Sequence, residues 1–266
     1  MAVITVKHEG LEYLTAENIS VPHCFTTRLG GVSSGYLEGL NLGANRGDDY
    51  QNVCRNYEIL GQALGFTPEQ LVLTRQTHSD IVRAVDAADA QGLDHRDYPE
   101  CDALITDRPG VGLVVFTADC TPILLHDPCT GAVGAIHAGW RGTAANIAGK
   151  TVEEMVRRYG CYPANIRAAI GPNVGQCCFE TDWEVPEAML ETYGSEAETH
   201  FRAVGNKCYV NLKNINALAL QQAGVRRVEI SSDCTACMPQ RYWSHRRMGD
   251  QRGSQGAVIL CQEVDA

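Results

Sequence analysis

The chain has 266 residues, a formal net charge of −10 and a hydrophobic content of 44%. These values fit a globular protein with a sizeable core, in one large domain or two small ones. The negative charge disfavours nucleic acid and anionic lipid as partners and leaves a basic protein partner open. The start, MAVITVKHEG, holds only a short apolar run, and no run reaches the roughly 18 apolar residues of a membrane span. We therefore expect a soluble, cytoplasmic protein that acts on small molecules.

Hydrophobic periodicity and turn residues predict strands and helices that alternate along the chain. Because no Pro-, Gly- or Ser-rich linker divides them, a single mixed α/β domain over residues 1–266 is the simplest prediction. Two passages are predicted to be irregular, the glycine-rich TRLGGVSSGYLEGLNLGANRGDD and residues 86–100. The predicted elements, in chain order, are strands at 3–6 and 23–27, a helix from Asp48 or Asp49 to Leu64, strands at 71–74, 81–85, 102–106, 113–117 and 132–136, a helix from Thr143 to about Tyr159, a strand at 167–170, helices at 183–193 and 212–223, and strands at 227–230 and 257–260.

The stretch from Gly112 to Gly142 holds two apolar, strand-like runs that each end at a potential metal ligand. The first run ends at Cys120 and the second at His137, while a third candidate, His78, lies upstream in QTHSD. A thiolate and two imidazoles suit zinc, and three protein ligands leave a fourth position open, as in catalytic zinc sites. The three residues are too far apart in sequence for one loop, so only the fold can bring them together.

Several arginines are candidate ligands for an anion. Arg141 and Gly142 precede the predicted helix from Thr143, whose first N–H groups and dipole favour negative charge. Arg46 and Arg28, in the glycine-rich passage, are candidate second groups, and a surface arginine in a capping loop is the alternative for Arg141. The glycines lack the GxGxxG and GxxxxGK[ST] patterns, so we do not expect a nucleotide phosphate loop.

The twelve cysteines are better explained as reduced thiols, some of them ligands, than as disulfides. Cys177, Cys178, Cys234 and Cys237 are a candidate four-cysteine zinc site, although adjacent cysteines do not easily bind one ion. A reactive or substrate-facing Cys178 next to Glu180 is a stronger hypothesis, and inert thiols are favoured over both.

The segment RYWSHRRMGDQ, residues 241–251, places aromatic rings between arginines, among them Arg246. Aromatic and guanidinium faces both stack on planar ligands, so the segment is a candidate wall for a purine base. A solvated surface segment is the alternative.

The motifs QTHSDIV, DALITDRPGVGL, TADCTPILLHD, GAVGAIHAGWRGTAANI, AAIGPNVGQCCFE and CTACMPQRYWSHRRMGDQRGSQGAVIL closely resemble the YfiH-type family, long described as multicopper polyphenol oxidases or laccase-domain proteins. The resemblance runs from about Phe25 to Leu260. It implies a layered α/β/β/α fold with mixed sheets and one zinc ion held by His78, Cys120 and His137.

The same resemblance implies a zinc-dependent purine nucleoside phosphorylase. Such an enzyme converts adenosine, inosine, guanosine and S-methyl-5′-thioadenosine to free base and (methylthio)ribose 1-phosphate, and it deaminates adenosine. Two residues depart from the pattern: Cys101 stands where many relatives have alanine, and Arg46 where histidine is common.

For this reaction we expect phosphate near Arg46 or Arg141 and substrate contacts from Arg246. Proton transfer is assigned to Asp119, Cys178 or Glu180, without a choice among the three.

Two other functions are weighed against this one. A multicopper oxidase needs about ten histidines, typically in His-x-His pairs, whereas this chain has eight and no such pair. Copper is therefore expected only as an adventitious substitute for zinc. A non-catalytic protein that binds a metal or a partner is the alternative of a different class.

Overall fold

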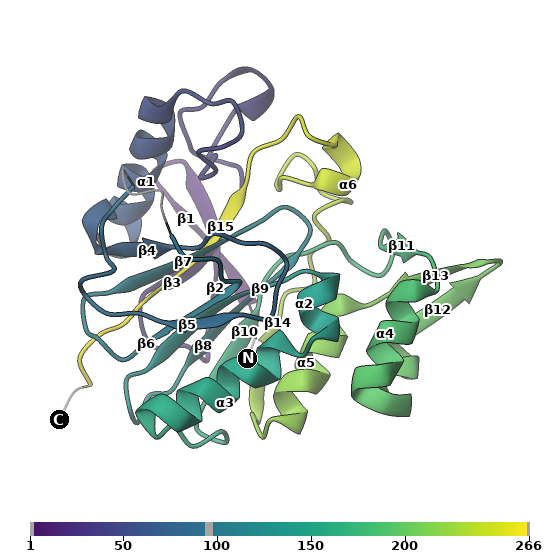
Figure 1. Ribbon diagram of the computed structural model, residues 1–266. Coiled ribbons are helices and arrows are strands. Elements are labelled where there is room, and N and C mark those ends of the chain that lie inside the picture. Colours follow the sequence, from purple (N-terminus) through teal and green to yellow (C-terminus); the bar gives the residue numbers. More distant parts are fainter. Residues whose placement is uncertain (1–2, 94–97, 265–266) are drawn as a thin grey trace.

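The computed structural model describes residues 3–93 and 98–264, which form two six-stranded sheets and one three-stranded sheet (Figure 1). The first sheet has the order β1 (Val3–His8), β2 (Leu11–Ala16), β3 (His23–Thr26), β15 (Gln255–Leu260), β7 (Gly112–Thr117), β4 (Leu71–Leu73). The second has the order β14 (Arg227–Ile230), β10 (Arg167–Ile170), β8 (Thr121–His126), β9 (Val133–Ala138), β6 (Ala103–Thr106), β5 (Val82–Ala84). The third has the order β11 (Glu180–Thr181), β13 (Lys207–Val210), β12 (Phe201–Val204).

Helices cover the outer sides of the two large sheets (Figure 1). Helix α1 (Tyr50–Leu64) packs on the first sheet, and α3 (Ile147–Tyr159) and α5 (Leu212–Gln222) pack on the second. The remaining helical segments are η1 (Gly35–Leu37), η2 (Pro68–Gln70), α2 (Trp140–Ala144), α4 (Glu184–Tyr193), η3 (Gly194–His200) and α6 (His245–Met248).

The alternation of side chains along the central strands explains the layers. In β7, Leu113 and Val115 face the core between the two sheets, whereas Val114 faces α1. In β8, Leu124 faces the core between the sheets, whereas Ile123 and Leu125 face α3 and α5. Both faces of these strands are buried, and so they are apolar at nearly every position. The predicted α/β/β/α layering is confirmed.

Both large sheets are mixed, as predicted. The pairs β4–β7, β5–β6 and β10–β14 are parallel, and the other pairs are antiparallel. Because β10 and β14 run in parallel, the segments that follow them leave the same edge of the second sheet.

The structure differs from the predicted elements in several places. Strands β2, β8, β11, β12 and β13 were not predicted. The predicted helix from Thr143 is divided: α2 begins at Trp140, and α3 begins only after Asn146, whose side chain caps Gly149 N. Arg141 therefore lies inside a five-residue helix and not before the first turn of a long one.

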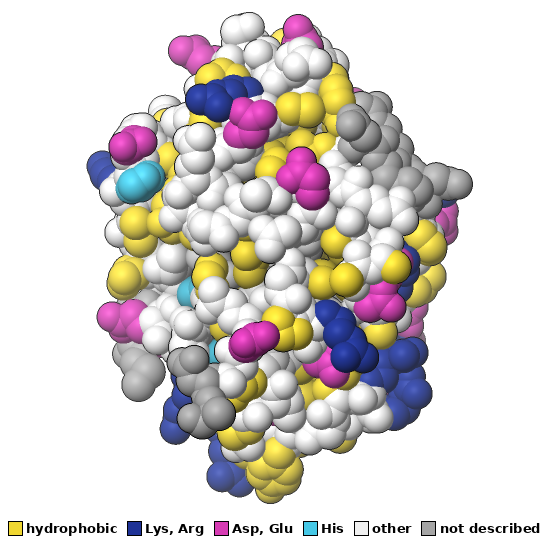
Figure 2. Space-filling view, turned by 90° about the vertical axis from the view of Figure 1, so that its left-hand side faces the viewer, with side chains coloured by type: hydrophobic (Ala, Val, Ile, Leu, Met, Phe, Trp, Pro, Cys, Tyr) yellow, Lys and Arg dark blue, Asp and Glu magenta, His cyan; other side chains and the backbone are white. Residues whose placement is uncertain are grey.

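Three expectations concern parts of the chain as a whole. Residues 94–97 of the predicted irregular passage 86–100 lie outside the described residues, and the single domain over residues 1–266 stays a prediction. In the part of the chain that the structure describes, no helix has both the length and the apolar character needed to cross a bilayer. Acidic and basic side chains are interspersed on the face in Figure 2, with hydrophobic side chains in small groups between them.

Candidate active site

The three predicted metal ligands lie together, although they come from three separate parts of the chain. His78 lies in the loop between β4 and β5, Cys120 directly precedes β8, and His137 lies near the end of β9. Their potential ligand atoms all lie within 4.8 Å of one another. His78 Nε2 is 3.7 Å from Cys120 Sγ, and the two imidazole rings meet edge to face with centroids 5.0 Å apart.

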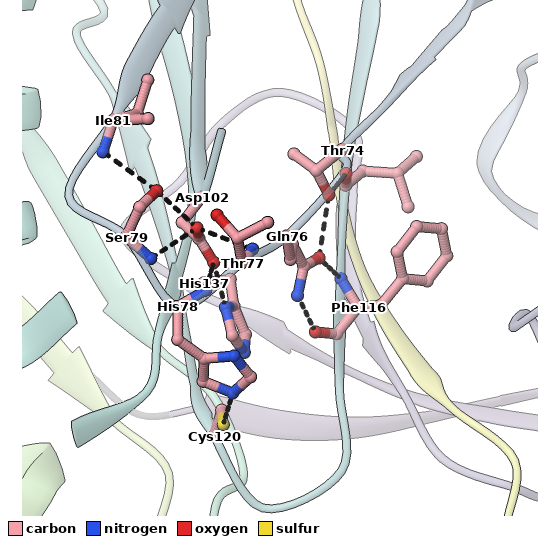
Figure 3. A network of polar contacts seen from close by, with 11 residues as sticks. Thr74, Gln76, Thr77, His78, Ser79, Ile81, Asp102, Phe116, Cys120 and His137 are labelled. Atoms are coloured by element: carbon pink, nitrogen blue, oxygen red, sulfur yellow. Dashed lines mark hydrogen bonds and ion pairs between the residues drawn. The ribbon is translucent and has the colours of Figure 1, made fainter. Parts of the chain in front are cut away.

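A buried carboxylate, Asp102, organises this cluster (Figure 3). Its Oδ1 lies 2.7 Å from His137 Nδ1, so the Nε2 atom of that ring remains for a metal ion. The same carboxylate accepts hydrogen bonds from the backbone amides of Thr77, His78 and Ser79 and from the Ser79 hydroxyl. Asp102 therefore fixes both the ring of His137 and the turn that carries His78.

One ligand position and the residue before another have left-handed backbone conformations. His78 has φ 60°, and Asp119, the residue before Cys120, has φ 93°. Such values are uncommon for residues other than glycine, and they concentrate at functional sites. Asp102 holds the first of these turns, while the Asp119 carboxylate accepts hydrogen bonds from Thr235 Oγ1 and Arg246 N.

Gly139 makes room for the cluster. A Cβ atom at this position would lie 2.6 Å from His78 Cδ2 and 3.4 Å from Cys120 Sγ. The His78 ring therefore packs against backbone that only glycine can provide. Gly139, in the motif HAGWRG, thus contacts the ring of His78, in the motif QTHSD.

Charge in the cluster shifts the pKa values of its members. Burial would raise the pKa of Cys120, but the imidazoles of His137 and His78 outweigh burial and lower it. Burial would lower the pKa of His137, but the Cys120 thiolate and the Asp102 carboxylate raise it. Burial also opposes ionisation of Asp102, yet hydrogen bonds from His137 and Ser79 hold its pKa at about 2. Cys120 is thus prepared to act as a thiolate ligand.

A cavity of about 430 Å³ opens beside the cluster and includes His78, Cys120 and His137 in its wall. Four aromatic side chains and three arginines also line it: Tyr50, Tyr57, Tyr98, Phe116, Arg46, Arg75 and Arg252. A smaller cavity of about 130 Å³ shares His78 and Cys120 with the first and is lined by Asp119, Trp140 and Arg141, among others. The metal-ligand cluster therefore lies where two cavities meet.

The arginines have different surroundings. Arg46 and Arg252 line the larger cavity, and Arg252 Nε is buried with no hydrogen-bond partner among the described residues. Arg141 lines the smaller cavity, where its guanidinium lies 4.2 Å from the Trp140 ring centroid. The Arg246 guanidinium instead donates to the backbone carbonyls of Cys178 and Glu180. Sequence reasoning missed Arg252, for which the sequence offers only an arginine directly before Gly253 and Ser254 in the segment QRGSQG.

The three candidates for proton transfer are also separated. Asp119 lines the smaller cavity next to Cys120. Glu180 is exposed and accepts a hydrogen bond from Tyr209, and Cys178 Sγ lies 3.4 Å from Cys237 Sγ. Neither Cys178 nor Glu180 lines the two cavities.

Residues 22–262 match the family model described as "Multi-copper polyphenol oxidoreductase laccase". The chain belongs to this family. It is 40% identical over 259 residues to a purine nucleoside phosphorylase of Deinococcus radiodurans, covering 94% of this chain and 93% of that one. It is 36% identical over 246 residues to "Adenosine deaminase RL5" from an unknown prokaryotic organism, covering 90% of this chain and 93% of that one.

The fold is also that of a solved family member. The crystal structure of the Bacillus licheniformis hypothetical protein YfiH superposes with a TM-score of 0.90 at 32% identity, covering 96% of this chain and 98% of that chain. The resemblance to the YfiH family that the sequence motifs indicate is thereby confirmed.

The cluster of His78, Cys120 and His137 fits one metal ion better than the several copper ions that the description of the family suggests. Within the described residues, only His78 and His137 among the histidines belong to a cluster of potential metal ligands. His23, by comparison, is buried and hydrogen-bonded through both ring nitrogens to Ala16 and Val21. One thiolate and two imidazoles, with a carboxylate behind one ring, form a suitable donor set for a single zinc ion.

Proposed function

We propose that this protein is a zinc-dependent purine nucleoside phosphorylase, with zinc held by His78, Cys120 and His137. The observation that carries the proposal is the position of this cluster in the wall of a cavity that contains aromatic rings and arginines. The name of the relative from Deinococcus radiodurans supports the same activity.

The larger cavity suits a nucleoside in size and chemistry. Its volume of about 430 Å³ lies within the range of small-molecule sites. The rings of Tyr50, Tyr57, Tyr98 and Phe116 provide apolar faces for a purine. Because stacking requires no particular ring substituent, this wall accommodates adenine, hypoxanthine and guanine alike.

Arg46 and Arg252 form the proposed phosphate site. Both line the larger cavity, and the unpartnered Nε of Arg252 is a buried donor that an anion oxygen would satisfy. Burial together with the charge of Arg46 lowers the pKa of Arg252, as expected for two guanidiniums that lie near each other. A bound phosphate would neutralise both.

In the proposed reaction, a phosphate oxygen attacks C1′ of the nucleoside while the C1′–N9 bond breaks. The purine leaves with the electron pair of that bond and takes up a proton at N7. Of the three residues considered for proton transfer, Asp119 is our choice, because it lines the cavity that shares His78 and Cys120 with the substrate cavity. A zinc ion at the cluster would supply Lewis acidity to the substrate.

Deamination of adenosine is a second proposed activity of the same site. Zinc held by these three residues would have a coordination position left for water, as hydrolytic zinc enzymes require. The name of the relative RL5 supports this activity.

Incubation of the zinc-loaded protein with adenosine or inosine, with and without phosphate, tests the proposal by chromatography of the products. Free base that forms only with phosphate supports phosphorolysis, and inosine that forms from adenosine without phosphate supports deamination. If neither substrate is consumed in either condition, the non-catalytic alternative is favoured.

A further inference from the structure

Four cysteines form a second cluster of potential metal ligands. The Sγ atoms of Cys177, Cys178, Cys234 and Cys237 all lie within 4.8 Å of one another. We infer that these four thiols bind a second zinc ion, as a structural site distinct from His78, Cys120 and His137.

The fold brings the two cysteine pairs together in a defined way. Cys177 and Cys178 follow β10, and Cys234 and Cys237 follow β14, its parallel neighbour. The pairing of the two strands continues beyond their ends through a parallel bridge between Asn173 and Cys234. The sulfurs therefore meet at one edge of the sheet, just beyond this bridge.

The distances between the sulfurs suit a tetrahedral zinc site. Cys237 Sγ lies 3.5 Å from Cys177 Sγ and 3.4 Å from Cys178 Sγ. Four sulfurs held at about 2.3 Å from a central zinc ion lie about 3.8 Å from one another. A small outward movement of the thiols would therefore admit the ion.

A tight turn explains how two adjacent cysteines can take part, contrary to the expectation from sequence. The backbone amides of Cys178 and Phe179 both donate to the carbonyl of Gly175, which bends the chain between Gly175 and Phe179. In this bend the Sγ atoms of Cys177 and Cys178 both lie close to Cys237 Sγ.

Backbone donors near Cys234 support the assignment independently. Gly175 N donates to Cys234 Sγ at 3.1 Å, and the backbone of Cys237 donates to the same sulfur. Such N–H donors stabilise the negative charge of a thiolate ligand. The cysteines also pack tightly against Gly175, where a Cβ atom would lie 3.1 Å from Cys234 Cβ and 3.2 Å from Cys177 Sγ.

A buried cation next to the cluster supplies compensating charge. Lys213 is 6% exposed, and its Nζ donates to the backbone carbonyls of Ser231 and Asp233. It also lies close enough to Cys234 and Cys177 to interact with their charges. A zinc ion bound by four thiolates has a net charge of about −2, which a buried ammonium group partly balances.

The second zinc ion would hold one wall of the active site. Thr235 lies between the two cysteines of the second pair and donates to the Asp119 carboxylate, which also accepts from Arg246 N. Val174 and Phe179, on either side of the first pair, line the smaller cavity. The ion would thus join the two segments that contact Asp119, the residue next to Cys120.

Cobalt binding to the Cys120→Ala protein tests the inference. In this variant the first cluster has no thiolate, so an intense thiolate-to-cobalt charge-transfer band must come from the four cysteines. We expect the band to appear with about one equivalent of Co²⁺, because the thiols release their protons when they bind the metal. It should disappear when Zn²⁺ is added, because zinc displaces cobalt from the site. Cys120→Ala protein, kept reduced, that develops no such band would overturn the inference.

Zinc content provides a second readout that does not depend on turnover. We expect about two zinc ions per chain in the wild-type protein and about one in each of Cys237→Ser and His137→Ala. Cys129→Ser, which changes another exposed thiol, is the matched control and should retain both ions. Equal zinc content in Cys237→Ser and Cys129→Ser would contradict the inference. So would a disulfide among the four cysteines in protein purified under reducing conditions. Loss of activity without loss of this zinc would bear on the proposed function alone.

Discussion

The Asp102 carboxylate lies 2.7 Å from His137 Nδ1 and also accepts hydrogen bonds from the backbone turn that carries His78. One buried side chain thus positions two of the three proposed zinc ligands. Because a carboxylate behind a ligand ring raises the basicity of the ring and fixes its orientation, Asp102 should matter for metal affinity although it binds no metal itself.

The substitution Asp102→Asn should therefore weaken zinc binding by about 10- to 100-fold, since an amide can neither accept as many hydrogen bonds nor balance charge. Competition with a chromophoric chelator measures the affinity. Asp107→Asn, near the surface, is the control. If Asp102→Asn folds normally and binds zinc as tightly as the control, the proposed role of Asp102 is wrong.

Gly139→Ala should displace the His78 ring, because the new Cβ atom would lie 2.6 Å from His78 Cδ2. We expect zinc at the first cluster to be lost or bound at least about tenfold more weakly. Gly134→Ala, in strand β9, which ends just before Gly139, is a matched control, since its Cβ atom would meet neighbours only at 3.4–3.5 Å. A calorimetric zinc titration compares the affinities of the two variants, and equal affinities would exclude this steric role.

Arg252→Gln should raise the KM for phosphate by about 10- to 100-fold, the equivalent of a charge-assisted hydrogen bond of about 1.5–3 kcal/mol. The KM for the nucleoside should change less, because the aromatic wall remains. Arg226→Gln, at an exposed position that lines neither cavity, is the control. Initial rates at varied phosphate concentration give both constants, and an unchanged phosphate KM would remove Arg252 from the proposed site.

Acid should destabilise the fold through His126, which is 3% exposed and whose Nδ1 has no partner among the described residues. Burial and the nearby Arg167 charge lower its pKa from 6.5 to about 4. Below the pKa that His126 has in the unfolded chain, the unfolded chain binds the proton more readily than the folded protein does. The contribution of His126 is therefore complete above pH 6.5 and falls by about 3 kcal/mol as the pH decreases to about 4.

Denaturant unfolding between about pH 7 and pH 4 measures this effect in the wild type, His126→Gln and the exposed control His8→Gln. The free energy of unfolding of His126→Gln should depend less on pH than that of either other protein. Identical pH dependence in all three would show that His126 does not contribute.

The sequence alone could identify His78, Cys120 and His137, because each lies at the end of a strand-like run or in a polar turn. It could not identify Asp102 as their organiser, since an aspartate before the run ALIT also fits an ordinary turn. The contact depends on the pairing of β6 with β9, which places residue 102 beside His137. Arg252 was missed for a similar reason, because only the fold brings the C-terminal segment to the cavity.

Strand β8 shows the limit of periodicity. Its sequence, TPILLH, contains Pro122, which cannot donate to a strand ladder and argues against a central strand. In the structure Pro122 lies opposite His137, and its carbonyl accepts a hydrogen bond from Gly171 N. The strand therefore lacks only the one hydrogen bond that a backbone N–H at position 122 would donate. The division of the helix after Trp140 depends similarly on one residue, Asn146, which has φ 58° and caps α3.

The most direct test of the proposed function is phosphorus NMR of the zinc-loaded protein with inosine and inorganic phosphate, next to His137→Ala under the same conditions. We predict that ribose 1-phosphate accumulates together with hypoxanthine in the wild type and that both are lost in His137→Ala. Phosphate that remains unchanged in the wild type, or equal product in the two proteins, would contradict a zinc-dependent phosphorylase.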